Sequence, residues 1–213
     1  MKTLPWENYS PDNWEIWRLK FAAPLKTERG NQDDQVPEYL GLENVESWTG
    51  KLVLSSLNGG SNDDKDNLQI NGIAFNSSHV LFGKLRPYLA KVFLPETSGI
   101  CSTEFLVLEP TEKINRKYLF YTLLTKEFIA TINASTFGSK MPRANWDFIG
   151  SQSIPVPPIS EQDKIVNYLD RETAEIDALI SEKERSIAFL KERRSALITA
   201  AVTGQIALEE MTS

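Results

Sequence analysis

Histidine and cysteine are nearly missing from this chain of 213 residues, which has one of each. A single cysteine, Cys101, excludes an internal disulfide and is typical of a cytoplasmic protein. We expect it to be a small residue that is buried or half-buried. A single histidine, His79, leaves no second histidine for a metal cluster, and it offers little for a Ser-His-Asp triad. We therefore expect His79 to be structural or merely exposed, and the sequence gives little support for an enzyme.

Long apolar runs are also missing. No stretch of about 18 apolar residues is present, which excludes an ordinary transmembrane helix. Residues 1–10 lack the basic start and apolar middle of a signal peptide. The pair Gly59-Gly60 lacks the third glycine and the strand-to-helix setting of a phosphate-binding loop. These absences predict a cytoplasmic protein with no membrane span.

Apolar residues are nevertheless numerous enough for a core, at 41% of the chain with ten Phe, six Tyr and five Trp. The net charge is −6, which taken alone argues weakly against nucleic acid. The charge is uneven, however. Residues 84–143 hold nine Lys and Arg against five Asp and Glu, whereas residues 159–213 hold seven against eleven. The acidic balance therefore does not exclude a basic surface in the first part of the chain.

Residues 1–158 have the pattern of one mixed α/β domain. Alternating or β-branched segments predict strands near 14–19, 70–75, 80–82, 88–94 and 104–108. Apolar residues then recur at helical spacing, which predicts one amphipathic helix over 115–133. A loop at 137–143 and an extended segment to Pro158 complete the domain.

Residues 159–204 predict one long helix. Pro155, Pro157 and Pro158 form a stiff junction before it, Ser160 resembles a helix cap, and Gly204 ends the helix. Alternate steps of four and three residues trace a heptad seam in which seven of ten positions are apolar. The positions are Leu169, Thr173, Ile176, Ile180, Lys183, Ile187, Leu190, Arg194, Leu197 and Ala201. A seam this narrow is typical of a coiled coil, so we expect the helix to pair, with residues 205–213 as a tail.

Two patterns suggest chemistry. Pro11-Asp12 and the later Asp63-Asp64-Lys65 superficially resemble a divalent-cation site of a nuclease, but the second group lies in a polar loop that is poorly suited to hold a metal. The other pattern is basic residues interleaved with aromatic or polar ones, which suit phosphates and base edges. These residues are Lys84, Arg86, Lys91, Ser139, Lys140, Arg143 and Asn145. The alternative is that Arg86 pairs with an acid inside the fold and that the lysines belong to an ordinary surface.

Several segments match a known family in order along the chain. They read Phe82-Gly83-Lys84-Leu85-Arg86-Pro87-Tyr88, Phe137-Gly138-Ser139-Lys140-Met141-Pro142-Arg143, Ile154-Pro155-Val156-Pro157-Pro158 and Glu161-Gln162. The ending from Glu192 to Ile206 and the opening from Asn13 to Lys20 are also similar. On these motifs the chain resembles the specificity subunit of type I DNA restriction-modification systems.

The resemblance implies an α+β fold: a mixed α/β target recognition domain (1–158) that reads one half of a split double-stranded DNA target, followed by one long coiled-coil helix (159–204). It also implies docking to methylation and restriction subunits, which carry the S-adenosylmethionine and ATP chemistry, so that this chain itself is not catalytic and needs no cofactor. The usual subunit has two such domains and two helices. This chain has one of each and therefore resembles a half-size form.

A lone heptad helix needs a second copy to rebuild the double layout, so we expect an antiparallel homodimer that reads an interrupted palindrome. The expected contacts are Leu169, Ile176, Ile180, Lys183, Ile187, Leu190, Arg194 and Leu197. Bases are expected to be read within 26–79, and the candidates there are Asn58, Ser61, Asn62 and Asn67. The competing hypotheses are a coiled-coil assembly adaptor that does not bind DNA and, less favoured, a metal-dependent nuclease.

Overall fold

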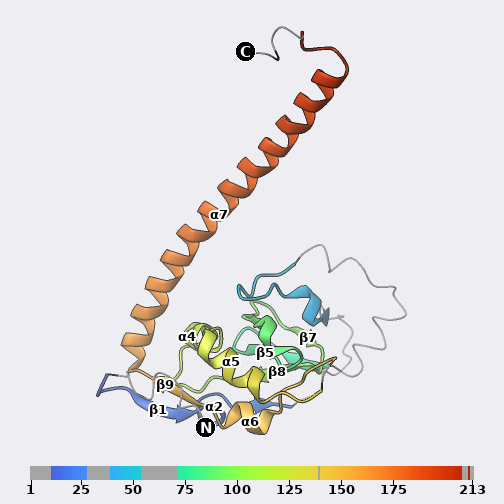
Figure 1. The fold of residues 1–213 in the computed structure, drawn as a ribbon. Helices are drawn as coiled ribbons and strands as arrows, with labels where there is room; N and C mark the ends of the chain where they lie inside the picture. The colour runs from blue at the N-terminus through green and yellow to red at the C-terminus, as the bar shows by residue number, and fades with distance from the viewer. Residues whose placement is uncertain (1–10, 28–38, 54–71, 139, 208–210, 212–213) are drawn as a thin grey trace. The chain divides into compact units, whose positions relative to one another are not determined.

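The computed structural model describes residues 11–27, 39–53, 72–138, 140–207 and 211 (Figure 1). The chain divides into two compact units, of which the first ends at Val166 and the second begins at Asn167. The first unit is a globular α+β domain. The second consists mainly of the long C-terminal helix, so the predicted fold class is confirmed.

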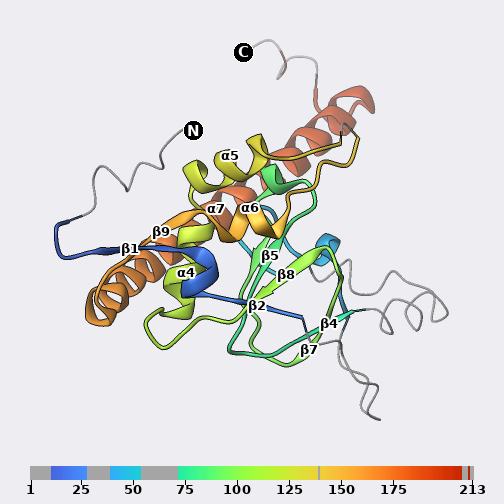
Figure 2. The ribbon, with the colours of Figure 1, turned by 90° about the horizontal axis from the view of Figure 1, so that it is seen from below.

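The centre of the domain is an antiparallel sheet of four short strands in the order β2-β8-β5-β6. They are β2 (Leu25–Lys26), β8 (Phe105–Leu108), β5 (Val80–Gly83) and β6 (Val92–Phe93). Figure 2 shows β5 and β8 side by side. All residues of β5 and β8 are buried, and successive side chains of a strand point to opposite faces. Both faces of this pair are therefore covered, and the domain has two cores.

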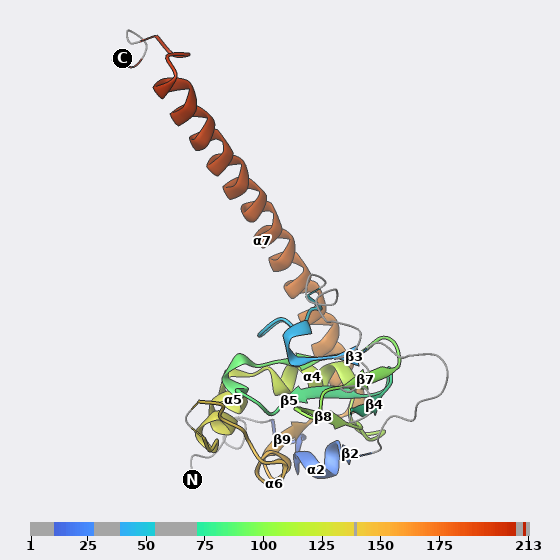
Figure 3. The ribbon, with the colours of Figure 1, turned by 90° about the vertical axis from the view of Figure 1, so that its right-hand side faces the viewer.

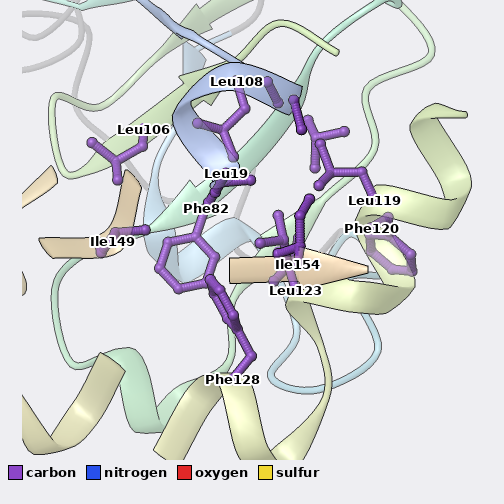
Figure 4. Packing of buried hydrophobic residues seen from close by; sticks show 14 of the residues in the cluster. Leu19, Phe82, Leu106, Leu108, Leu119, Phe120, Leu123, Phe128, Ile149 and Ile154 are labelled. Atoms are coloured by element: carbon purple, nitrogen blue, oxygen red, sulfur yellow. The ribbon is translucent and has the colours of Figure 1, made fainter. Parts of the chain in front are cut away.

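The larger core covers the face that carries Val80, Phe82, Leu106 and Leu108. Short helices pack on this face, as Figure 4 shows for the labelled side chains. These helices are α2 (Leu19–Ala22), α4 (Arg116–Leu123), α5 (Lys126–Ala134) and α6 (Trp146–Gly150). The rings of Phe82 and Phe128 meet edge to face, with centroids 5.9 Å apart. Aromatic pairs prefer this geometry because the positive ring edge faces the negative ring face.

The smaller core covers the opposite face, where Leu81, Phe105 and Val107 point. A three-stranded sheet in the order β3-β7-β4 supplies its other side. Its strands are β3 (Tyr39–Leu40), β7 (Gly99–Cys101) and β4 (Ile73–Phe75), and a 3-10 turn at Leu42–Asn44 follows β3. Figure 3 shows this sheet at the end of the domain away from α5.

The two ends of the domain meet in a third, two-stranded sheet. Strand β1 (Glu15–Arg18) pairs antiparallel with β9 (Ser153–Val156), which runs directly into the long helix α7 (Ile159–Val202). The predicted helix and its end are confirmed, since Gly204 takes a positive φ of 74° and the Gln205 N–H donates to the Ala200 carbonyl at 2.8 Å. The start of α7 is thus tied to the first strand of the domain.

Three predicted elements were wrong in detail. The single helix over 115–133 is two helices, because Thr125 takes an extended conformation that ends α4 and begins α5. The strand over 88–94 is reduced to β6, because a 3-10 turn at Pro87–Leu89 stands between Arg86 and Ala90, both left-handed. The extended segment before Pro158 contains α6, which Asn145 caps.

The two scarce residues have structural positions. His79 is buried, and its Nδ1 accepts a hydrogen bond from the Asn76 N–H at 2.9 Å. Cys101 is fully buried in the smaller core, where its Sγ lies 3.5 Å from the Ile73 carbonyl oxygen. Burial raises the pKa of the Cys101 thiol to about 12. Both predictions of a structural role are confirmed.

The second unit leaves its apolar side chains exposed. Ile176, Ile180, Ile187, Leu190 and Leu197 of the seam are each 50–59% exposed. Among the described helices, none is both long enough and apolar enough to cross a membrane.

Replacement of Phe128 should test the larger core. We expect Phe128→Ala to lower the free energy of unfolding by about 3–5 kcal/mol, because the lost ring leaves a cavity against Phe82. Phe21→Ala is the matched control, since Phe21 is 61% exposed, and it should cost less than about 0.5 kcal/mol. Urea unfolding followed by tryptophan fluorescence measures both, and equal losses would contradict the packing described.

Alkylation of Cys101 should test the smaller core. The raised pKa leaves roughly a thousandfold less thiolate than an ordinary cysteine at the same pH, and only the thiolate reacts readily. We expect iodoacetamide at pH 8 to modify the folded protein very slowly and the urea-unfolded protein quickly, as measured by mass spectrometry. Similar rates in the two states would show that Cys101 is not buried.

Candidate nucleic-acid interface

Two loops that are far apart in the sequence lie together in the domain. The first is 84–90 and the second is 136–145, and we call them the paired loops. The Arg86 N–H donates to the Pro142 carbonyl at 2.7 Å, and the Ala144 N–H donates to the Lys84 carbonyl at 3.0 Å. An isolated β-bridge between Leu85 and Arg143 lies between these two bonds. The backbone thus brings both groups of predicted basic residues onto one surface.

The first of the paired loops turns back sharply on itself. Arg86 and Ala90 have φ values of 49° and 47°, in the left-handed region that residues other than glycine rarely adopt. The 3-10 turn between them packs on α5, as Figure 2 shows. Such conformations cost free energy, and they persist where contacts with the surrounding structure stabilise them, often at functional sites. This turn places Arg86 and Tyr88 at the surface.

Arg143 is held by an ion pair. Its Nε and Nη2 donate to the Glu104 carboxylate at 2.9–3.2 Å, and Glu104 comes directly before β8. The hydrogen bond to Glu104 and its negative charge raise the pKa of the Arg143 guanidinium. The pair braces the second of the paired loops against the central sheet. Its geometry suits Arg143 for positioning the loop.

Two more of the predicted residues are used inside the fold. The Lys91 Nζ donates to the Leu42 carbonyl at 2.6 Å, and burial lowers the pKa of this lysine while Glu43 partly opposes the shift. The Asn145 side chain accepts from the Asp147 N–H at 3.1 Å and so caps α6. These contacts join neighbouring elements of the domain.

The exposed cations of the paired loops are Arg86 and Lys140, with Lys84 half-buried beside them. The Arg86 Nη2 lies 3.5 Å from the Lys140 carbonyl oxygen, at the limit of a hydrogen bond, so the Arg86 side chain reaches the backbone of the second loop at Lys140. Positive side chains at a protein surface can neutralise phosphates. Because Arg86 and Lys140 are exposed, they do not bear the free-energy cost of desolvation that a buried charge bears.

Three large side chains with apolar surface accompany these cations. The sequence predicted Tyr88 as an aromatic residue interleaved with the basic ones, but it did not place Phe137 or Met141 in the site. Tyr88, Phe137 and Met141 are 45%, 64% and 47% exposed. Apolar residues beside Gly138 and Lys140 in a loop are a weak signal, because the sequence alone does not tell a buried loop residue from an exposed one. The backbone of Phe137 is fixed by two hydrogen bonds to Arg143, which hold its side chain at the surface.

The remaining predicted residues lie outside the described part of the chain. They are Asn58, Ser61, Asn62 and Asn67, the candidates for base readout, together with Ser139 of the second loop. Asp63, Asp64 and Lys65 of the nuclease-like pattern fall there too. Among the described residues, no group of three or more His, Cys, Asp or Glu is placed to hold a metal ion.

Known proteins provide the context for this surface. Residues 25–188 match the family model of the type I restriction modification DNA specificity domain. The chain is 24% identical over 197 residues to the EcoDI specificity subunit of Escherichia coli, covering 92% of this chain and 43% of that protein. It is 25% identical over 190 residues to the MjaVIII specificity subunit of Methanocaldococcus jannaschii, covering 88% and 41%.

Solved structures show the same fold. The HsdS subunit from Thermoanaerobacter tengcongensis matches with a TM-score of 0.64 at 22% identity, over 87% of this chain and 49% of that one. A chain from a study of complex assembly and conformational transition of the type I R-M system matches with a TM-score of 0.67 at 22% identity, over 93% and 50%. The chain spans less than half the length of these two curated relatives. Because the family model covers most of its residues, including both of the paired loops, the chain belongs to the type I restriction-modification DNA specificity family.

Proposed function

We propose that this protein recognises one half of a split double-stranded DNA target for a type I restriction-modification complex and pairs through α7 with a second copy. The observation that carries the proposal is the family match over residues 25–188, which includes the paired loops and most of α7. In this role the protein is the non-catalytic subunit, and it acts in the cytoplasm.

The paired loops supply the positioning contacts in this proposal. Arg86 and Lys140 contact phosphates, and Lys84 adds charge beside them. Tyr88 and Phe137 offer exposed rings that can pack on sugars or bases. Arg143, Lys91 and Asn145 hold these loops in shape through their contacts within the domain. Base choice is assigned to the stretch that contains Asn58, Ser61, Asn62 and Asn67.

Pairing follows from the second unit. This unit is mainly the helix α7, which carries the heptad seam. Ile176, Ile180 and Ile187 of the seam are about half exposed in the single chain. Burial of apolar surface is the main favourable term in association, so an antiparallel pair of α7 helices covers this seam. Lys183 and Arg194, the charged seam positions, then select the register.

The methylation and restriction subunits are the further partners that we propose. Tyr168 and Phe189 are 56% and 65% exposed and stand three heptads apart on α7, outside the seam. They remain available to another protein when the seam is paired. S-adenosylmethionine and ATP belong to those partners.

An adaptor that pairs but does not bind DNA is the second candidate, and the exposed seam suits it equally well. A ligand of the folded state raises the melting temperature of its protein. If the proposal holds, duplex DNA should therefore raise the melting temperature of the purified protein in a thermal shift assay. If the protein is only an adaptor, duplex DNA should leave that temperature unchanged.

Replacement of Lys140 tests the phosphate contact. We expect Lys140→Ala to weaken binding to all duplexes alike and to reduce the slope of log K against log salt by about one, because one released counterion is lost. Lys164→Ala is the control, since it removes the same charge from an exposed site on α7 outside the paired loops. Fluorescence anisotropy over a salt series measures both. A changed sequence preference in Lys140→Ala, or equal slopes in Lys140→Ala and the wild type, would refute the phosphate role.

A charge in the seam tests the pairing. We expect the wild type to be a dimer at micromolar concentration by light scattering, and Ile180→Asp to be monomeric because an unpaired carboxylate is costly to bury. Ser181→Asp carries the same charge one residue away, outside the seam, and should remain a dimer. A monomeric wild type would rule out the homodimer.

A further inference from the structure

A fully buried glutamine lies in the first turn of α7. Gln162 is 0% exposed, and α7 belongs to the globular unit as far as Val166, so the surroundings of Gln162 lie wholly within that unit. Polar side chains of this type are mostly exposed in proteins. The burial of this amide is explained by its hydrogen-bond partners.

All three hydrogen bonds of the Gln162 amide go to backbone groups. Its Nε2 donates to the carbonyls of Lys113 and Pro157, at 2.8 and 2.7 Å. Its Oε1 accepts from the Asn115 N–H at 2.8 Å. Lys113 and Asn115 lead into α4, and Pro157 comes directly after β9. One side chain thus joins three parts of the domain at the point where α7 begins.

The neighbours of Gln162 hold the same turn from other directions. The Glu161 carboxylate accepts from Asn13 Nδ2 and Trp14 Nε1, both at 2.8 Å. The Asp163 carboxylate accepts from Asn115 Nδ2, also at 2.8 Å. Successive residues of an α-helix point about 100° apart. The hydrogen bonds of three consecutive side chains therefore surround much of the first turn of α7. They oppose both rotation of this turn about the helix axis and its translation along that axis.

This arrangement is directional in a way that apolar packing is not. A core of Leu and Val tolerates small rotations, whereas a buried amide whose three bonds are all made loses them when the helix turns. Helix α7 then continues without a break to Val202.

We infer that Gln162 is the positioning residue that fixes the spacer between the two DNA half-sites. The inference rests on the proposed function, in which two domains on paired α7 helices read a split target. Gln162 does not contact DNA. It determines how firmly each domain holds the first turn of its own α7 helix.

Selection from a random-sequence duplex library tests this role, using the full chain in complex with its methylation subunit. Sequencing of the selected duplexes gives the half-site bases and the distribution of spacer lengths. We expect the wild type to select one spacer length. Gln162→Met keeps the size of the side chain but loses the three bonds, and it should leave the half-site bases unchanged while lowering spacer preference about tenfold.

Gln152→Met is the matched control, because Gln152 is also a buried glutamine of the same unit but donates to the Phe148 carbonyl, within the region of α6. It should lower the melting temperature and keep the wild-type spacer. If Gln162→Met fails to fold, Asp163→Ala decides the question, since it loosens the same turn at an exposed position and should broaden the spacer distribution in the same direction.

Two results would overturn the inference. If the Gln162 variant, or Asp163→Ala in its place, selects the wild-type spacer distribution, the residue only stabilises the fold. If the wild type selects no split sequence, the proposed function fails, and this inference fails with it.

Discussion

The exposed apolar seam of α7 is the constraint on which the rest of the molecule depends. Ile176, Ile180, Ile187, Leu190 and Leu197 are half exposed or more in the single chain. Apolar surface of this extent drives association, and a heptad repeat selects another helix as the partner. In the proposed function, that pairing sets the number of recognition domains, their separation and the symmetry of the DNA that they read.

The globular domain divides its polar residues between two tasks. Arg143 with Glu104, Lys91 with the Leu42 carbonyl and Asn145 at α6 hold segments in place. Arg86 and Lys140 remain at the surface beside exposed rings. At the start of α7, Gln162 and Asp163 also hold segments in place through their hydrogen bonds. In the proposed function, the surface charges of Arg86 and Lys140 contact DNA, while the hydrogen-bonded polar groups fix geometry.

Sequence reasoning predicted the elements whose pattern is local. The seam of α7 and its glycine end depend on spacing along one helix, and the apolar strands β5 and β8 are short and bounded by prolines or turns. It missed features set by tertiary contacts. The break at Thr125, the left-handed Arg86 and Ala90, and the exposure of Phe137 depend on neighbours distant in the sequence. The ion pair of Arg143 with Glu104 was not predicted, because nothing local identifies the partner, and the internal pair considered from the sequence was one of Arg86.

Sequencing of DNA methylation in a host that expresses this chain with its methylation subunit tests the central claim most directly. Two identical domains related by a twofold axis should direct methylation to an interrupted palindrome, with the same bases in inverted order on either side of a fixed spacer. Methylation of two different half-sites, or of one uninterrupted sequence, would contradict a homodimer that reads a split target.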